Sequence, residues 1–68
     1  MLRFAHVVPP DPPAERIDAY AAKIFGVLTS RNQAKKAIKA GQLTRNGERC
    51  RSAWFVAEGE ELVLTLSR

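Results

Sequence analysis

Basic side chains are concentrated in one part of this 68-residue chain. Residues 31–51 hold seven lysines and arginines but a single acid, Glu48, so this segment carries a charge of +6. Because the whole chain carries +4, the remaining residues together carry −2. A concentrated positive patch on an otherwise slightly acidic protein is typical of a surface that binds a polyanion, above all a nucleic acid. The alternative is a charged face that only meets solvent.

The first half of the basic segment has the spacing of an amphipathic helix. At about 100° per residue, Arg31, Lys35 and Lys39 fall on one stripe, and Lys36 lies beside it. A second stripe is apolar and would face the core; it consists of Ala34, Ala37 and Ile38. We therefore expect a helix that packs on one side and presents positive charge on the other.

Residues on both sides of this helix predict its two ends and the hairpin after it. Ser30 and Gln33 have the spacing of a capping box, and Gly41 suits the left-handed position after a helix end. Asn46-Gly47 is typical of a two-residue hairpin turn, between strands at 42–45 and 48–51. In that hairpin Leu43 and Cys50 would face inward, so Arg45 must turn away from the core edge.

The rest of the chain predicts elements that support the basic segment. Residues 3–8 can form a strand at a sheet edge, because prolines follow at once within residues 9–13. A helix is expected over 14–25, a turn over 58–60 and a closing strand over 61–66. The apolar face of that helix would be Ile17, Tyr20, Ala21, Ile24 and Leu28. We expect Trp54 to pack in the core rather than stack on nucleic-acid bases, and His6 to point to solvent.

Composition argues against several other classes of protein. With one cysteine, Cys50, and one histidine, His6, the chain has no internal disulfide and no metal-ligand set. No stretch approaches the roughly 20 apolar residues of a membrane span, and the opening residues are not a signal peptide. We expect a single cytoplasmic domain over 1–68. The sequence shows no catalytic arrangement or glycine-rich phosphate loop, so we predict no enzyme activity, cofactor or small-molecule substrate.

One family has a similar pattern over most of the chain. The sequence resembles the RNA-binding domain named after the fourth protein of the small ribosomal subunit, also called the alpha-L motif. The resemblance covers residues 16–64 and is carried by Arg16-Ile17-Asp18, by Leu28-x-Ser30-Arg31-x-x-Ala34-x-x-x-Ile38-x-x-Gly41-x-Leu43-x-x-Asn46-Gly47, and by Val56-x-x-Gly59-Glu60-x-Leu62.

The resemblance implies an α+β fold with two packed helices against a small antiparallel sheet of three to five short strands. It also implies that RNA lies against the second helix and the following hairpin. By position it assigns RNA contact to Arg31, Lys35, Lys39, Asn46 and Arg49, and also to Arg16 and Lys36. Arg51 joins these candidates as part of the basic segment. Arg45 departs from the family, which usually has an apolar residue there, and would either add an RNA contact or mark a looser hairpin.

Three functions are compatible with these features. The first is a stand-alone module, free or bound to the ribosome, that reads phosphates and shape in structured ribosomal or transfer RNA. The second is a detached RNA-docking domain of a pseudouridine synthase, because the strand and spacer at the amino terminus are similar to the start of the large-subunit enzymes. Small ribosome-rescue heat-shock proteins are also similar in layout. The third is a basic protein-interaction adaptor on the ribosome.

Overall fold

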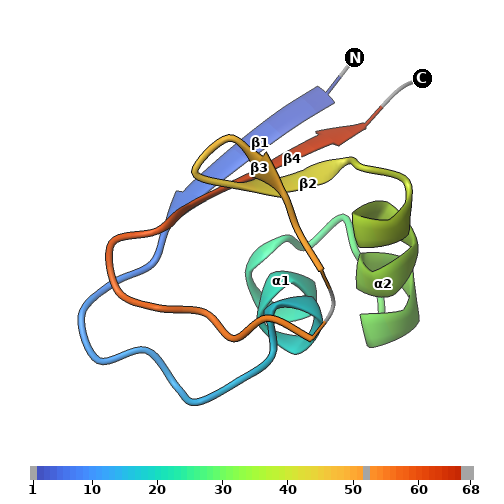
Figure 1. The fold of residues 1–68 in the computed structure, drawn as a ribbon. Helices are drawn as coiled ribbons and strands as arrows, with labels where there is room; N and C mark the ends of the chain where they lie inside the picture. Colours follow the sequence, from blue (N-terminus) through green and yellow to red (C-terminus); the bar gives the residue numbers. More distant parts are fainter. Residues whose placement is uncertain (1, 52, 67–68) are drawn as a thin grey trace.

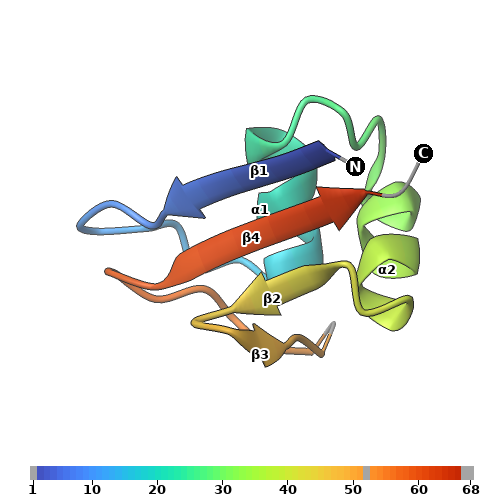
Figure 2. The ribbon, with the colours of Figure 1, turned by 90° about the horizontal axis from the view of Figure 1, so that it is seen from above.

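The computed structural model of the chain describes residues 2–51 and 53–66. Two helices pack against each other and against one face of a four-stranded antiparallel sheet (Figures 1 and 2). The elements in chain order are β1 (Leu2–Val7), α1 (Ile17–Ile24), α2 (Arg31–Lys39), β2 (Leu43–Arg45), β3 (Glu48–Arg49) and β4 (Glu61–Leu66). The predicted α+β architecture is therefore confirmed.

The sheet has the strand order β1-β4-β2-β3, which places β1 at an edge as predicted. Leu64 in β4 lies opposite Phe4 in β1 and Leu43 in β2. Because residues opposite each other point to the same side of a sheet, these side chains form one row beneath the helices. Leu43, Leu62 and Leu64 are fully buried, and this row is the floor of the core.

The helices complete the core with the apolar stripes that the sequence predicts. Ile17, Tyr20 and Ala21 of α1 are buried, and so are all three apolar stripe residues of α2. Cys50 is buried as expected, and Trp54 is half-buried against the same cluster. The prediction that Trp54 packs in the core is therefore confirmed.

Helix α1 is shorter than the predicted helix over 14–25, because residues before it are held in an extended conformation. Arg16 forms an isolated antiparallel bridge with Phe55. On either side of it, the Ile17 amide donates to the Trp54 carbonyl (2.7 Å) and the Val56 amide donates to the Glu15 carbonyl (3.2 Å). This long-range pairing competes with helix formation at 14–16, and the helix begins only at Ile17.

The boundaries of α2 and the position of the hairpin turn agree with the sequence. The two hairpin strands are shorter than the predicted 42–45 and 48–51, because β2 spans Leu43–Arg45 and β3 only Glu48–Arg49. The Ser30 hydroxyl accepts from the Gln33 amide (3.3 Å), although the Gln33 side chain makes no return bond among the described residues, so half of the capping box forms. At the other end Gly41 has φ +78°, and two backbone bonds from residues 41 and 42 close the last turn. Asn46 (φ 51°) and Gly47 (φ 83°) form the left-handed pair that a two-residue hairpin turn requires.

The expectation that His6 points to solvent is wrong. His6 lies opposite the buried Leu62 in the β1–β4 register, so it shares the inward face of the sheet. Its Nε2 lies 2.8 Å from the hydroxyl oxygen of Tyr20, and the two rings are 5.5 Å apart. His6 therefore satisfies the one polar group of a buried tyrosine.

Candidate RNA-binding surface

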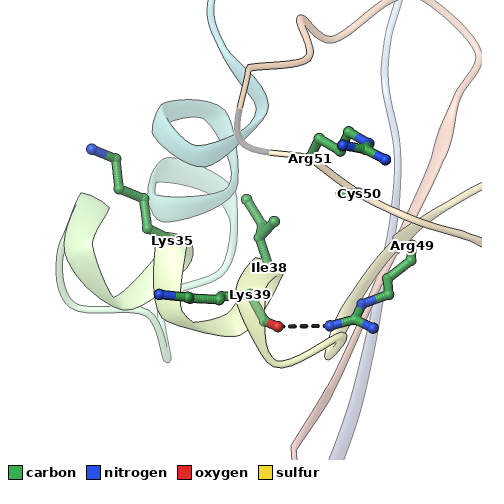
Figure 3. A pocket seen from close by; sticks show the side chains of 6 residues that line it. All are labelled: Lys35, Ile38, Lys39, Arg49, Cys50 and Arg51. Carbon is green, nitrogen blue, oxygen red and sulfur yellow. Dashed lines mark hydrogen bonds between the residues drawn. The ribbon is translucent and has the colours of Figure 1, made fainter.

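A groove of about 660 Å³ lies between α2 and the chain that leaves β3 (Figure 3). Lys35 and Lys39 extend from the helix, and Arg49 and Arg51 come from the opposite side. The remaining lining residues, Ile38 and Cys50, are buried and apolar. The groove thus has cationic walls over an apolar floor, and none of its lining residues is acidic.

The rotation of α2 about its axis determines which of its lysines line the groove. Its apolar stripe is buried against the core, which fixes the rotation of the helix about its axis. Lys35 and Lys39 are one turn apart and lie on the same flank, whereas Lys36 is exposed and is not among the groove-lining residues. Arg31 lies one turn before Lys35 and continues the flank toward the amino end of the helix.

Arg49 fastens the hairpin to the carboxyl end of α2. Its Nη2 donates a hydrogen bond to the Lys39 carbonyl (2.7 Å), one of the last carbonyls of the helix (Figure 3). The guanidinium lies directly over Gly41, where a Cβ atom would come within 3.0 Å of Arg49 Nε. Gly41 therefore serves both the turn and the packing of Arg49, and the Arg49 bond connects the two walls of the groove.

Arg31 is held by a buried carboxylate, Asp18, and the sequence alone does not predict this ion pair. Arg31 Nε donates to Asp18 Oδ2 (3.1 Å), and Asp18 Oδ1 accepts from the Ala19 amide (2.8 Å). The Asp18 side chain is 1% exposed and that of Arg31 is 52% exposed. The available sequence signal for this ion pair was an acid beside the predicted apolar face of α1, because a charge that is buried in a protein is nearly always paired.

Arg45 makes its contacts within the protein. It leaves the core edge, as expected, by folding over Trp54, with the guanidinium carbon 3.7 Å from the ring centroid. Its Nε lies 3.1 Å from Glu60 Oε2, which ties β2 to the turn before β4. The guanidinium is thus engaged by an aromatic face and a carboxylate within the protein.

Two further candidates lie outside the groove. Asn46 is at the hairpin turn, the end of the hairpin that points away from α2 (Figures 1 and 2). Its Oδ1 accepts from the Glu61 amide (2.9 Å), which secures the turn to β4. Arg16 is exposed and precedes α1, where it pairs with Phe55.

The structure therefore separates the nine candidates into groups. Lys35, Lys39, Arg49 and Arg51 line one groove. Arg31 extends the same flank of α2, while Lys36, Arg45, Asn46 and Arg16 lie elsewhere on the molecule.

Cys50 in the floor of the groove is an unreactive thiol. Burial raises its pKa from 9.0 to about 11; nearby Arg45 lowers the pKa and Glu60 raises it, both to a smaller degree. At neutral pH the group is therefore a protonated, weakly polar core side chain. Residues 2–51 and 53–66 hold no cluster of His, Cys, Asp or Glu that could bind a metal ion, and neither helix there is long and apolar enough to cross a membrane.

A comparison with protein families gives a match over most of the chain. The model of the family described as "S4 domain" matches residues 15–62, which is more than half of the chain. No curated protein matches the sequence. The matched range contains both helices, the hairpin and all four groove cations.

Proposed function

Since the chain belongs to the S4 domain family, a family of non-catalytic RNA-binding modules, we propose that it binds structured ribosomal or transfer RNA. In this proposal the RNA backbone lies in the groove between α2 and the chain after β3. The observation that supports it is the lining of that groove, in which four of six residues are cationic and none is acidic.

The chemistry of the groove favours phosphates over bases. Lysine and arginine side chains bind phosphate oxygens, and arginine can donate two parallel hydrogen bonds. The lining holds no aromatic ring on which a base could stack and no Asn or Gln to read a base edge. An RNA duplex hides most of its base edges in a deep groove but presents phosphates and 2′-hydroxyls, so it suits a rigid, cationic surface.

Two basic side chains of this surface, one in the groove and one beside it, are held in place before RNA arrives. Arg49 is bonded to the end of α2, and Arg31 is bonded to Asp18. Side chains that are already ordered lose less conformational entropy on binding, which favours affinity. Asp18 thus acts as a positioning residue for Arg31. It binds Nε, and among the described residues the two terminal nitrogens make no further bond and are left for a phosphate.

Charge reversal at two lysines of the same helix tests the proposed site. Lys36 and Lys39 both lie in the last turn of α2, so each replacement by glutamate should cost a similar interaction with the helix dipole. We expect Lys39→Glu to weaken binding of an RNA hairpin at least fivefold, about 1 kcal/mol, and Lys36→Glu to weaken it less than twofold. Fluorescence polarisation at about 0.15 M salt, where distant charges are screened, measures both.

Lys35→Glu should repeat the effect of Lys39→Glu from the neighbouring turn. Equal losses for Lys36→Glu and the groove variants would mean that net charge alone governs binding, and the proposed site would be wrong. If the wild-type protein bound no structured RNA, the interpretation of the basic face as a protein-interaction surface would replace this proposal.

A further inference from the structure

We propose that Phe55 and Arg16 form a second RNA contact, which takes one unpaired nucleotide next to the stem bound in the groove. The inference rests on the proposed function. The ring of Phe55 is not part of the groove lining, and neither is Arg16, its partner on the protein surface.

Phe55 presents its ring to solvent. Its side chain is 55% exposed, whereas the other four described aromatic side chains are buried or half-buried. Trp54, its neighbour, is covered on one face by the Arg45 guanidinium and packs against the core. In a chain of this size, with so little apolar surface to bury, leaving a phenyl ring exposed gives up stabilisation that burial would provide.

The backbone holds this ring in a fixed position beside a guanidinium. Phe55 and Arg16 are directly opposite each other in an antiparallel bridge, so their side chains leave the same side of the two segments. The next residue on each segment, Val56 and Ile17, is buried, which forces the bridged pair outward. Hydrogen bonds on both sides of the pair fix the two segments to each other.

An exposed ring and an adjacent guanidinium match the two parts of a nucleotide. A nucleobase stacks on an aromatic face, and a guanidinium binds the phosphate attached to it. Bases inside a duplex are already stacked on their neighbours, so a protein ring can take only a base that is unpaired. The ligand of this site is therefore a nucleotide from a bulge, a loop or a single-stranded flank.

The second contact is continuous with the groove along the chain. Arg51 lines the groove, and the Trp54 amide donates to the Arg51 carbonyl (3.0 Å), which holds Trp54 beside this end of the groove. Phe55 follows Trp54 directly. The ring therefore lies near the Arg51 end of the groove, and one RNA ligand is expected to contact both.

Two RNA hairpins that differ in one feature test the inference. Both have the same stem, and one carries a single unpaired nucleotide within it. We expect the wild-type protein to prefer the bulged hairpin, and Phe55→Ala to lose roughly five- to hundredfold in affinity for it, the range observed for a stacked base. The affinity of Phe55→Ala for the fully paired hairpin should change less than twofold. Phe55→Tyr, which keeps the ring, should retain the preference.

Two controls separate stacking from other effects. Phe55→Leu keeps an apolar side chain but no ring, and should behave as Phe55→Ala does. Val27→Ala removes another exposed apolar group, 44% exposed in the wild type, and should change neither affinity.

If Phe55→Leu keeps the preference, or if Phe55→Ala affects both hairpins or neither, the inference is wrong. In the last case, with groove-dependent binding of the paired hairpin intact, the proposed function stands and the ring has no part in RNA binding. If the wild type binds neither hairpin, the proposed function fails and the inference fails with it.

Discussion

Among the described residues, Asp18 is the one charged residue that is buried in the core, and its partner Arg31 is half-exposed. This asymmetry predicts unequal effects of removing either member. Arg31→Gln leaves a carboxylate buried without a cation and should cost about 3 kcal/mol in the free energy of unfolding. Asp18→Asn leaves a cation that solvent can reach and should cost about half as much. Urea denaturation of both variants measures the difference.

The double variant provides the control for this pair. With both charges gone, no buried carboxylate remains, so the loss should be clearly smaller than the sum of the single losses. An Arg31→Gln variant that is more stable than Asp18→Asn would contradict the assignment of Asp18 as a buried, paired carboxylate. For RNA binding, Asp18→Asn should weaken affinity only where Arg31 is present, because it acts through that side chain.

Single residues also show what the sequence could not predict. The hairpin pattern predicts that Arg45 turns away from the core, but nothing in it indicates that Trp54 and Glu60 receive the side chain. Both partners belong to the segment before β4. This segment is distant from β2 in sequence and comes into contact with it only when the sheet forms. The prediction for His6 fails for the same reason, since the register of β1 against β4 decides which way it points.

At the scale of elements, two glycines with left-handed backbone conformations give a matched pair of variants. One precedes β2 and the other lies in the hairpin turn. Gly41 (φ +78°) and Gly47 (φ +83°) have nearly the same backbone conformation, so alanine at either position should cost about 1–2 kcal/mol in stability. Their surroundings differ. A Cβ at Gly41 would lie 3.0 Å from Arg49 Nε, whereas nothing lies within 4 Å of a Cβ at Gly47.

We therefore expect Gly41→Ala to weaken RNA binding severalfold and Gly47→Ala to leave it nearly unchanged. The first variant displaces Arg49 from the Lys39 carbonyl and so moves one wall of the groove. Both proteins would be compared at a temperature at which each is fully folded, by circular dichroism and by titration of the same RNA hairpin. Equal affinities would show that Arg49 adjusts freely and that its bond to α2 does not shape the groove.

Elements defined by local signals can be predicted from the sequence, and those that depend on distant strands cannot. Ser30, Gly41 and the Asn46-Gly47 turn act within a few residues of themselves, and each boundary lies where the sequence predicts it. The predicted start of α1 is wrong by three residues, because hydrogen bonds to Trp54 and from Val56 hold residues 15–17. The groove can be predicted as a basic helix beside a basic hairpin, but which cations face each other depends on the packing of α2.

At the scale of the whole molecule, acidic residues from outside the segment 31–51 form ion pairs with basic residues inside it. Asp18 pairs with Arg31 and Glu60 pairs with Arg45. Among the described residues, the four groove cations form no ion pair, and neither does Lys36. The fold thus neutralises basic residues at the margin and leaves the groove positively charged. The net charge of +4 therefore understates the local charge that an RNA strand meets in the groove.

The dependence of affinity on salt distinguishes a four-cation groove from a diffuse basic face. Each phosphate that a cation neutralises contributes about 0.7 to 0.9 to the slope of log affinity against log salt. The four groove cations together with Arg31 predict a slope of roughly −3.5 to −4.5, whereas all seven basic residues of 31–51 would give roughly −5 to −6. Arg51→Gln should reduce the magnitude by about one, and Arg45→Gln should leave it unchanged, because Arg45 is engaged by Glu60 and Trp54. Fluorescence polarisation across a salt series measures all three slopes. A wild-type slope steeper than −5 would contradict a defined groove, and so would equal effects of the two arginine variants. Either result would show that RNA binds the whole basic segment and that the ion pairs of the free protein open on binding.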